Sequence, residues 1–144
     1  MHPRPVKADE REAYDELCGY TLTHGNVAFI HQHVVDAWAA QHATPEGKPI
    51  GITFALAGLY LHVERQLTGR QVQLAHMRMA RQKRSWPTFV LPEDRGAMTA
   101  LDVMRAPEGE ERDKAIHAWA ESVWNAFSMN RATVVSLLEE YGYA

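Results

Sequence analysis

Residues 50–67 read IGITFALAGLYLHVERQL, and this stretch decides the fold class. Apolar side chains fill almost every position as far as Val63, so a helix here leaves no continuous face for water. A helix that is apolar nearly all round belongs in the interior of a helical protein. Pro49, directly before the stretch, suits the first turn of a helix. We therefore predict a central, buried helix over residues 50–67.

Helical spacing of apolar residues recurs along the rest of the chain. It predicts further helices over residues 9–22, 27–43, 70–84, 99–105, 110–129 and 130–141. We expect Gly25 and Asn26 to separate the first two, and Asn130 to cap the last. Residues 85–92 read SWPTFVLP, and their two prolines favour an extended segment, which Trp86 and Phe89 would pin to the core.

The predicted fold class is all-α. We expect a compact bundle of four main helices with additional short helices and one extended loop that contains Trp and Pro. The chain has 144 residues, the size of one helical domain, and residues 1–8 are expected to form a flexible N-terminal tail.

The composition indicates a soluble cytoplasmic protein. The net charge is -3, and Cys18 is alone, which excludes an internal disulfide and a thiolate cluster. The first ten residues have no apolar stretch, so we expect no signal peptide. The longest apolar run, residues 52–61, is too short to span a bilayer, so no membrane partner is expected.

Polar side chains concentrate on three of the predicted helices. His33 and Asp36 share a face of one, His62 interrupts the central apolar helix, and His76 lies among apolar residues of the next. If these helices face one another, the four side chains form a nitrogen-and-carboxylate site suited to zinc, iron, manganese or nickel. His31 and Glu64 are further candidate ligands.

Two interpretations of these residues stay open. In the first, the chain is a helical bundle that binds a metal or a small molecule at a His/Asp site between three neighbouring helices. In the second, the buried His, Asp and Glu residues are structural, and the chain is a non-enzymatic interaction module or a homodimer with an apolar patch around Trp38, Trp119 or Trp124. The residues leave open whether the chain catalyses a reaction, because they include no HExxH or other catalytic motif.

The predicted helix over residues 70–84 is basic and carries no acidic residue. Its arginines, Arg78 and Arg81 among them, could meet phosphate. They could equally complement the carboxyl end of the helix and face water. Because the whole chain is acidic, we do not expect nucleic-acid binding.

The strings FIHQHVVDA (29–37), KPI (48–50) and FALAGLYLHVE (54–64) resemble a family of small uncharacterised bacterial proteins, a domain of unknown function. The resemblance extends from about Tyr14 through most of the chain. It implies no activity and no catalytic residue, and it marks His31, His33, Asp36, His62 and Glu64 as lying in the stretches that define the family. At the level of fold alone, the chain is similar to DinB-like bundles that bind a metal through three histidines, although its histidine spacing differs from theirs.

Overall fold

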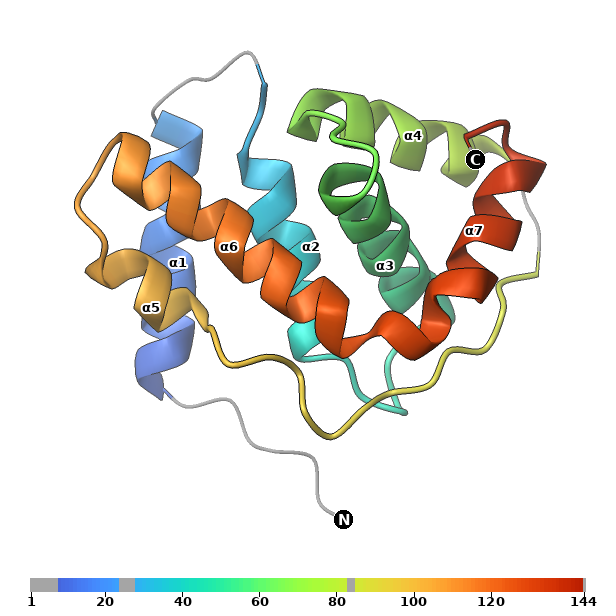
Figure 1. The fold of residues 1–144 in the computed structure, drawn as a ribbon, viewed down its shortest axis with the longest axis horizontal. Coiled ribbons are helices and arrows are strands. Elements are labelled where there is room, and N and C mark those ends of the chain that lie inside the picture. Colours follow the sequence, from blue (N-terminus) through green and yellow to red (C-terminus); the bar gives the residue numbers. More distant parts are fainter. Residues whose placement is uncertain (1–7, 24–27, 83–84, 144) are drawn as a thin grey trace.

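The computed structural model describes residues 8–23, 28–82 and 85–143, and it confirms the all-α prediction (Figure 1). None of the residues in these ranges lies in a β-strand. The helices in these ranges are α1 (Ala8–Thr23), α2 (His31–Gln41), α3 (Pro49–Val63), α4 (Gly69–Arg81), α5 (Ala100–Arg105), α6 (Glu110–Ala126) and α7 (Arg131–Glu140). A 3₁₀ turn, Ser128–Asn130, joins α6 to α7.

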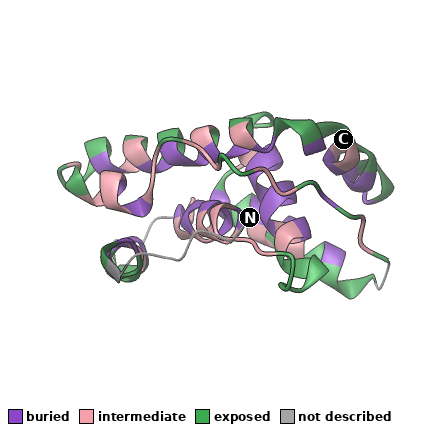
Figure 2. Cartoon of the chain, turned by 90° about the horizontal axis from the view of Figure 1, so that it is seen from below, coloured by how far each residue is buried: buried purple, intermediate pink, exposed green. Residues whose placement is uncertain are grey.

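Helix α3 is the centre of the fold, as its apolar sequence predicts. It packs against α2, α4, α6 and α7, while α1 packs against α2 and α5 (Figure 1). Residues 55–61 and Thr53 of α3 are buried, so the helix keeps almost no face for water. The buried residues of the other helices turn toward the middle of the molecule (Figure 2).

The start of α2 and the end of α3 differ most from the sequence prediction, and both differences have the same kind of cause. Helix α2 begins at His31 instead of near residue 27, and α3 ends at Val63 instead of near residue 67. Phe29 (φ 54°) and Gln66 (φ 59°) adopt left-handed backbone conformations, which a right-handed helix cannot pass through. Residues 24–27, where the break by Gly25 and Asn26 was expected, lie outside the described residues, as do residues 1–7 of the expected tail.

Residues 85–99 run extended beneath the helices, which confirms the prediction from the two prolines (Figure 1). Phe89 is buried, and Trp86 packs against the core. The side chain of Asn130, which was expected to cap α7, instead bonds to the backbone of the extended segment. Its side chain accepts a hydrogen bond from the backbone N of Val90 (2.7 Å) and donates one to the Val90 carbonyl (2.8 Å), and it makes no side-chain cap to α7.

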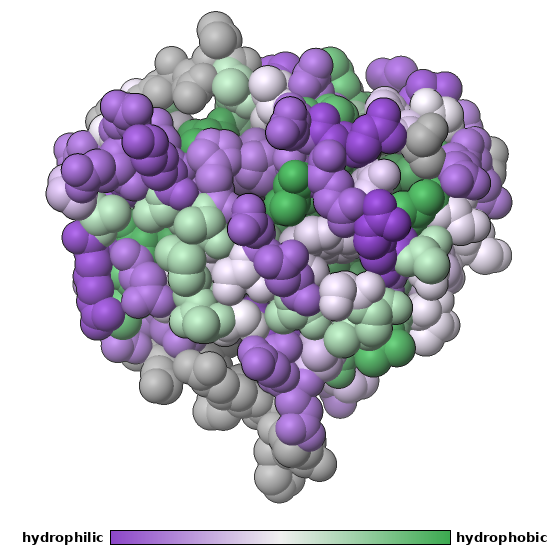
Figure 3. All heavy atoms as spheres, in the orientation of Figure 1, coloured by the Kyte–Doolittle hydropathy of each residue, from purple (hydrophilic) through white to green (hydrophobic). Residues whose placement is uncertain are grey.

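The tryptophans of α6 belong to the core. Trp119 and Trp124 are buried, and Trp38 of α2 is half-buried with its ring stacked on Tyr14 at 4.2 Å between centroids. An apolar surface patch therefore cannot include Trp119 or Trp124. The face of the molecule in Figure 3 is largely hydrophilic, with small, separate hydrophobic areas. No helix among the described residues is long and apolar enough to cross a bilayer.

Candidate functional site

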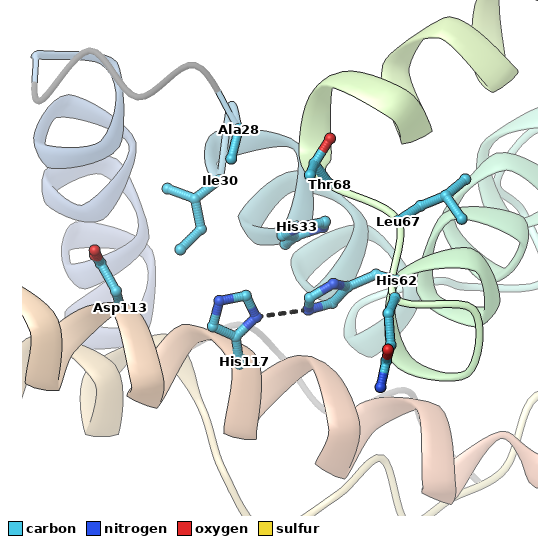
Figure 4. A pocket seen from close by; sticks show the side chains of 9 residues that line it. Ala28, Ile30, His33, His62, Leu67, Thr68, Asp113 and His117 are labelled. Carbon is cyan, nitrogen blue, oxygen red and sulfur yellow. Dashed lines mark hydrogen bonds between the residues drawn. The ribbon is translucent and has the colours of Figure 1, made fainter.

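A pocket of about 370 Å³ opens between the start of α2, the α3–α4 connection and α6 (Figure 4). Three of its lining side chains are imidazoles, which come from three different helices. The full lining is Ala28, Ile30, His33, His62, Gln66, Leu67, Thr68, Asp113 and His117. The pocket thus combines apolar walls with a concentrated set of nitrogen atoms, the composition expected of a small-ligand site.

His33 and His62 meet in this pocket, as the metal-site hypothesis requires. His33 lies in the first turn of α2, and His62 lies in the last turn of α3. Their rings stack with centroids 3.5 Å apart and an interplanar angle of 17°. Two of the four side chains predicted to form the site therefore lie side by side.

His117 of α6 is the third imidazole, and it was not among the site residues predicted from the sequence. Its Nδ1 lies 2.9 Å from Nε2 of His62, so one ring donates a hydrogen bond to the other (Figure 4). Its ring centroid is 4.7 Å from that of His62 and 5.8 Å from that of His33. A signal was present: Asp113 and His117 are four residues apart and share a helix face, the same carboxylate–imidazole pairing that singled out His33 and Asp36.

Burial keeps these imidazoles neutral near pH 7. Desolvation, followed by the neighbouring His62 and His117, lowers the pKa of His33 to about 2. Desolvation and then His117 lower the pKa of His62 to about 4. Partial desolvation also lowers the pKa of His117, against the opposing effect of the Asp113 carboxylate. In addition, Nδ1 of His33 is buried with no hydrogen-bond partner among the described residues, so the site holds an unused ring nitrogen.

The backbone around the pocket is strained and tightly joined. Of the two left-handed residues, Gln66 lines the pocket, and Phe29 stands between the lining residues Ala28 and Ile30 in the chain. The Arg70 backbone N donates to the Ala28 carbonyl (2.9 Å), which ties the start of α4 to the segment before α2. A Cβ at Gly69 would lie only 1.8 Å from the Phe29 carbonyl oxygen, so this close approach requires glycine. Backbone strain of this kind is concentrated at functional sites in proteins.

Asp36 and His76 form a separate buried cluster instead of joining the three histidines. Both approach the backbone of Gly58: a Cβ there would lie 1.9 Å from Oδ2 of Asp36 and 3.1 Å from Nε2 of His76. Gln32 donates to Oδ1 of Asp36 (3.1 Å), and Nε2 of His76 pairs with the Phe54 carbonyl (2.8 Å). Burial raises the pKa of Asp36 and lowers that of His76 to about 4. Neither residue lines the pocket.

The two further candidates, His31 and Glu64, have structural partners outside the pocket. Nδ1 of His31 pairs with the Thr21 hydroxyl at 2.9 Å. The Glu64 carboxylate accepts hydrogen bonds from Nε1 of Trp124 (2.7 Å) and from Arg131, whose Nη2 lies 2.7 Å away. These contacts hold the end of α3 against α6 and α7.

The three imidazoles are not arranged around a common point. No group of three or more His, Cys, Asp or Glu side chains within the described ranges has the arrangement of a metal site. The parallel stacking of His33 on His62 is the physical reason, because the lone pair of each imidazole nitrogen lies in the plane of its ring. Two rings stacked face to face at 3.5 Å hold their lone pairs in separate planes and cannot both direct one at the same ion.

Comparison with known proteins identifies a family of unknown function. A family model described as "Family of unknown function (DUF5946)" matches residues 8–128, which include all three histidines of the pocket. No curated protein and no solved structure matches the chain.

Proposed function

The chain belongs to DUF5946, a family of unknown function, and from the three imidazoles that line its pocket we propose that it binds a divalent transition-metal ion. The ligands are His33, His62 and His117. One observation carries the proposal: three neutral imidazoles from three helices line a single pocket. This set replaces the one expected from the sequence, since His117 takes the place of Asp36 and His76.

The chemistry of the donors favours zinc, nickel, iron or cobalt over magnesium or calcium. Neutral imidazole nitrogen is a preferred ligand for the first group, whereas magnesium and calcium prefer oxygen. A metal ion competes with protons for these nitrogens, and the lowered pKa values of His33 and His62 remove that competition at neutral pH. Three imidazoles leave one tetrahedral position free, where a bound zinc ion polarises a water or small-molecule ligand.

Binding requires a local rearrangement of two side chains. For both rings to bind the ion, His62 would turn out of its stack with His33, and the ring that donates the hydrogen bond between His62 and His117 would move its proton to its other ring nitrogen. His62 is half-buried and His117 exposed, so both rings can turn without opening the core. The Asp113 carboxylate, which Tyr20 contacts at 3.3 Å through its hydroxyl, faces the same pocket and can accept a hydrogen bond from a ligand there.

Calorimetric titration of metal-free protein with Zn²⁺ and Co²⁺ tests the proposal. We expect one ion per chain, and a visible Co²⁺ spectrum with the bands of a tetrahedral nitrogen site. His117→Ala should weaken binding by about tenfold or more, the scale on which even partners of metal ligands act. Because His117 is exposed, this variant removes a ligand without a cavity in the core.

His76→Ala is the matched control, since His76 is a histidine of the sequence-predicted set that lies outside the pocket. It should bind Zn²⁺ like the wild type, with its fold checked by circular dichroism. Loss of binding in His76→Ala but not in His117→Ala would reject the proposed ligand set. Failure of the wild-type protein to bind either ion would leave the histidines as structural groups.

A further inference from the structure

The outer face of α4 is positively charged and partly apolar. Residues 65–92 contain six Arg and Lys residues and no Asp or Glu, in a chain whose net charge is -3. Helix α4 turns Val72, Ala75 and Met79 into the core. Its opposite side exposes Leu74 (53%), Met77 (46%), Arg78 and Arg81, which follow helical spacing along one stripe.

The charges on this face have no carboxylate partner within the described chain. Arg78 lies over the Tyr143 ring at 5.4 Å from its centroid, and Arg70 lies over the Phe29 ring at 4.9 Å. None of the ion pairs among the described residues includes an arginine of α4. Two exposed apolar side chains surrounded by unpaired arginines have the composition of a protein interface, where Arg and Met are enriched and acidic residues depleted.

Helix α1 presents a surface of the opposite charge. Its outer side exposes Asp15, Glu16, Gly19 and Leu22, and Leu22 is 57% exposed, high among the large apolar residues described. Arg11 forms an ion pair with Asp15 at 3.3 Å on the exposed surface, where such a pair contributes little to the stability of the fold. Acidic residues and an exposed leucine thus share one helix face.

Gly19 is unexplained in the single chain. It lies inside α1, where glycine is less favourable than alanine by up to about 1 kcal/mol. A Cβ at this position would meet nothing within 4 Å. Its φ is not in the left-handed region, so neither packing nor backbone conformation calls for glycine here. A second helix lying close against α1 would supply the reason, because glycine permits close approach.

The two faces match in register when the helices run antiparallel. Leu22 is placed opposite Leu74. Gly19 lies three residues before Leu22 and Met77 three residues after Leu74, so in antiparallel helices both lie about 4.5 Å along the axis in the same direction. Asp15 lies seven residues before Leu22 and Arg81 seven residues after Leu74, so both lie about 10.5 Å from the leucine pair along the axis. The pairing therefore sets leucine against leucine, methionine against glycine, and carboxylate against guanidinium.

We propose that α1 of one copy of this chain docks antiparallel on α4 of another copy. The contact is between molecules, because α1 and α4 of the same chain lie on either side of α2 and do not pack together (Figure 1). Each copy carries both faces, so a two-fold pair forms two such contacts, and a head-to-tail chain forms one per junction. The inference is independent of the metal site, none of whose ligands lies on these faces.

Sedimentation velocity over a concentration series at low salt tests the contact. The wild type should form species larger than a monomer, and added salt should dissociate them. Gly19→Gln fills the space required by Met77 and should weaken association by about tenfold. Gly51→Gln is the matched control: Gly51 is also exposed, lies in a helix and has nothing within 4 Å of its Cβ position, and this variant should associate like the wild type.

Charge reversal gives a second, directional test. The variant Asp15→Arg/Glu16→Arg and the variant Arg78→Glu/Arg81→Glu should each lose self-association by about tenfold or more, because like charges then oppose one another. An equimolar mixture should regain it, since the reversed α1 of one variant complements the reversed α4 of the other. Reversing the exposed Glu110–Lys114 pair on α6 should have no effect.

A wild-type protein that stays monomeric at the highest concentration reached would overturn the proposal. Equal association of the wild type and Gly19→Gln, or a mixture of charge-reversed variants that stays monomeric, would do the same. Melting temperatures that are not lowered in the variants would show that the losses concern the interface and not the fold.

Discussion

Gly58 illustrates how closely the interior is packed at the level of single residues. A methyl group at this position would overlap Oδ2 of Asp36 at 1.9 Å and approach Nε2 of His76 at 3.1 Å. Both side chains are held by hydrogen bonds, Asp36 from Gln32 and His76 with the Phe54 carbonyl, so neither can simply move aside. Only glycine at residue 58 therefore leaves room for the Asp36 carboxyl group and the His76 imidazole between α2, α3 and α4.

Gly58→Ala should lower the free energy of unfolding by about 2 kcal/mol or more, the range observed for overpacked cores. Gly51→Ala, on the same helix, should leave it unchanged or raise it by up to about 1 kcal/mol, because its Cβ position is open and alanine favours helix. Urea unfolding followed by circular dichroism measures both. Equal stability of the two variants would contradict the packing of Asp36 and His76 against Gly58.

Single residues also mark the limit of what sequence predicts about the site. The sequence analysis placed His33 and His62 in one candidate site, and in the structure their rings lie against each other. The same reasoning grouped Asp36 and His76 with them, although these two are directed at Gly58 instead. The spacing of apolar residues predicts which face of a helix is buried. It does not predict how one helix is rotated relative to its neighbour. His117 escaped notice because its helix carries charged neighbours that indicate a solvent face.

At the level of elements, the helices were predictable and their ends were less so. Apolar periodicity located each described helix, and the prolines of residues 85–92 correctly indicated extended chain. The predicted start of α2 and the predicted end of α3 were wrong because Phe29 and Gln66 adopt left-handed conformations that neither residue type favours. Tertiary contacts impose these conformations, including the hydrogen bond from the Arg70 backbone to the Ala28 carbonyl, and local sequence contains no sign of them.

Gln66→Gly tests this helix end. Glycine adopts φ 59° without steric cost, so the variant should raise the free energy of unfolding by about 0.5–1 kcal/mol. Gln73→Gly places the same change inside α4 and should lower it by about 1 kcal/mol. Opposite signs in urea unfolding would establish the strain at Gln66, and a loss in both variants would reject it.

For the whole molecule, the buried histidines make stability depend on pH. The pKa values of His62 and His76 are lowered to about 4 and that of His33 to about 2, against 6.5 in an unfolded chain. Between pH 6.5 and 4 the unfolded state binds protons on these groups and the folded state does not. Each histidine then lowers the free energy of unfolding by about 1.4 kcal/mol per pH unit of acidification.

Asp36 opposes this trend, and its removal tests the balance. Burial raises its pKa well above the usual 3.8, so between pH 3.8 and that raised pKa the folded state holds a proton that the unfolded state lacks. Its contribution to stability therefore grows as the pH falls and is lost as the pH rises through the folded pKa. Three histidines outweigh one carboxyl group, so metal-free wild-type protein should lose stability steadily from pH 6.5 to 4.

Asp36→Asn removes the opposing group and should make that loss of stability steeper at every pH between 3.8 and the raised pKa of Asp36. His76→Gln removes one of the three histidines and should make it shallower by about 1.4 kcal/mol per pH unit between pH 6.5 and 4. Urea unfolding in the presence of a chelator, repeated from pH 7 to pH 4, measures the three slopes. Parallel slopes for all three proteins would mean that Asp36 and His76 titrate alike in the folded and unfolded states, and that water reaches the cluster around Gly58.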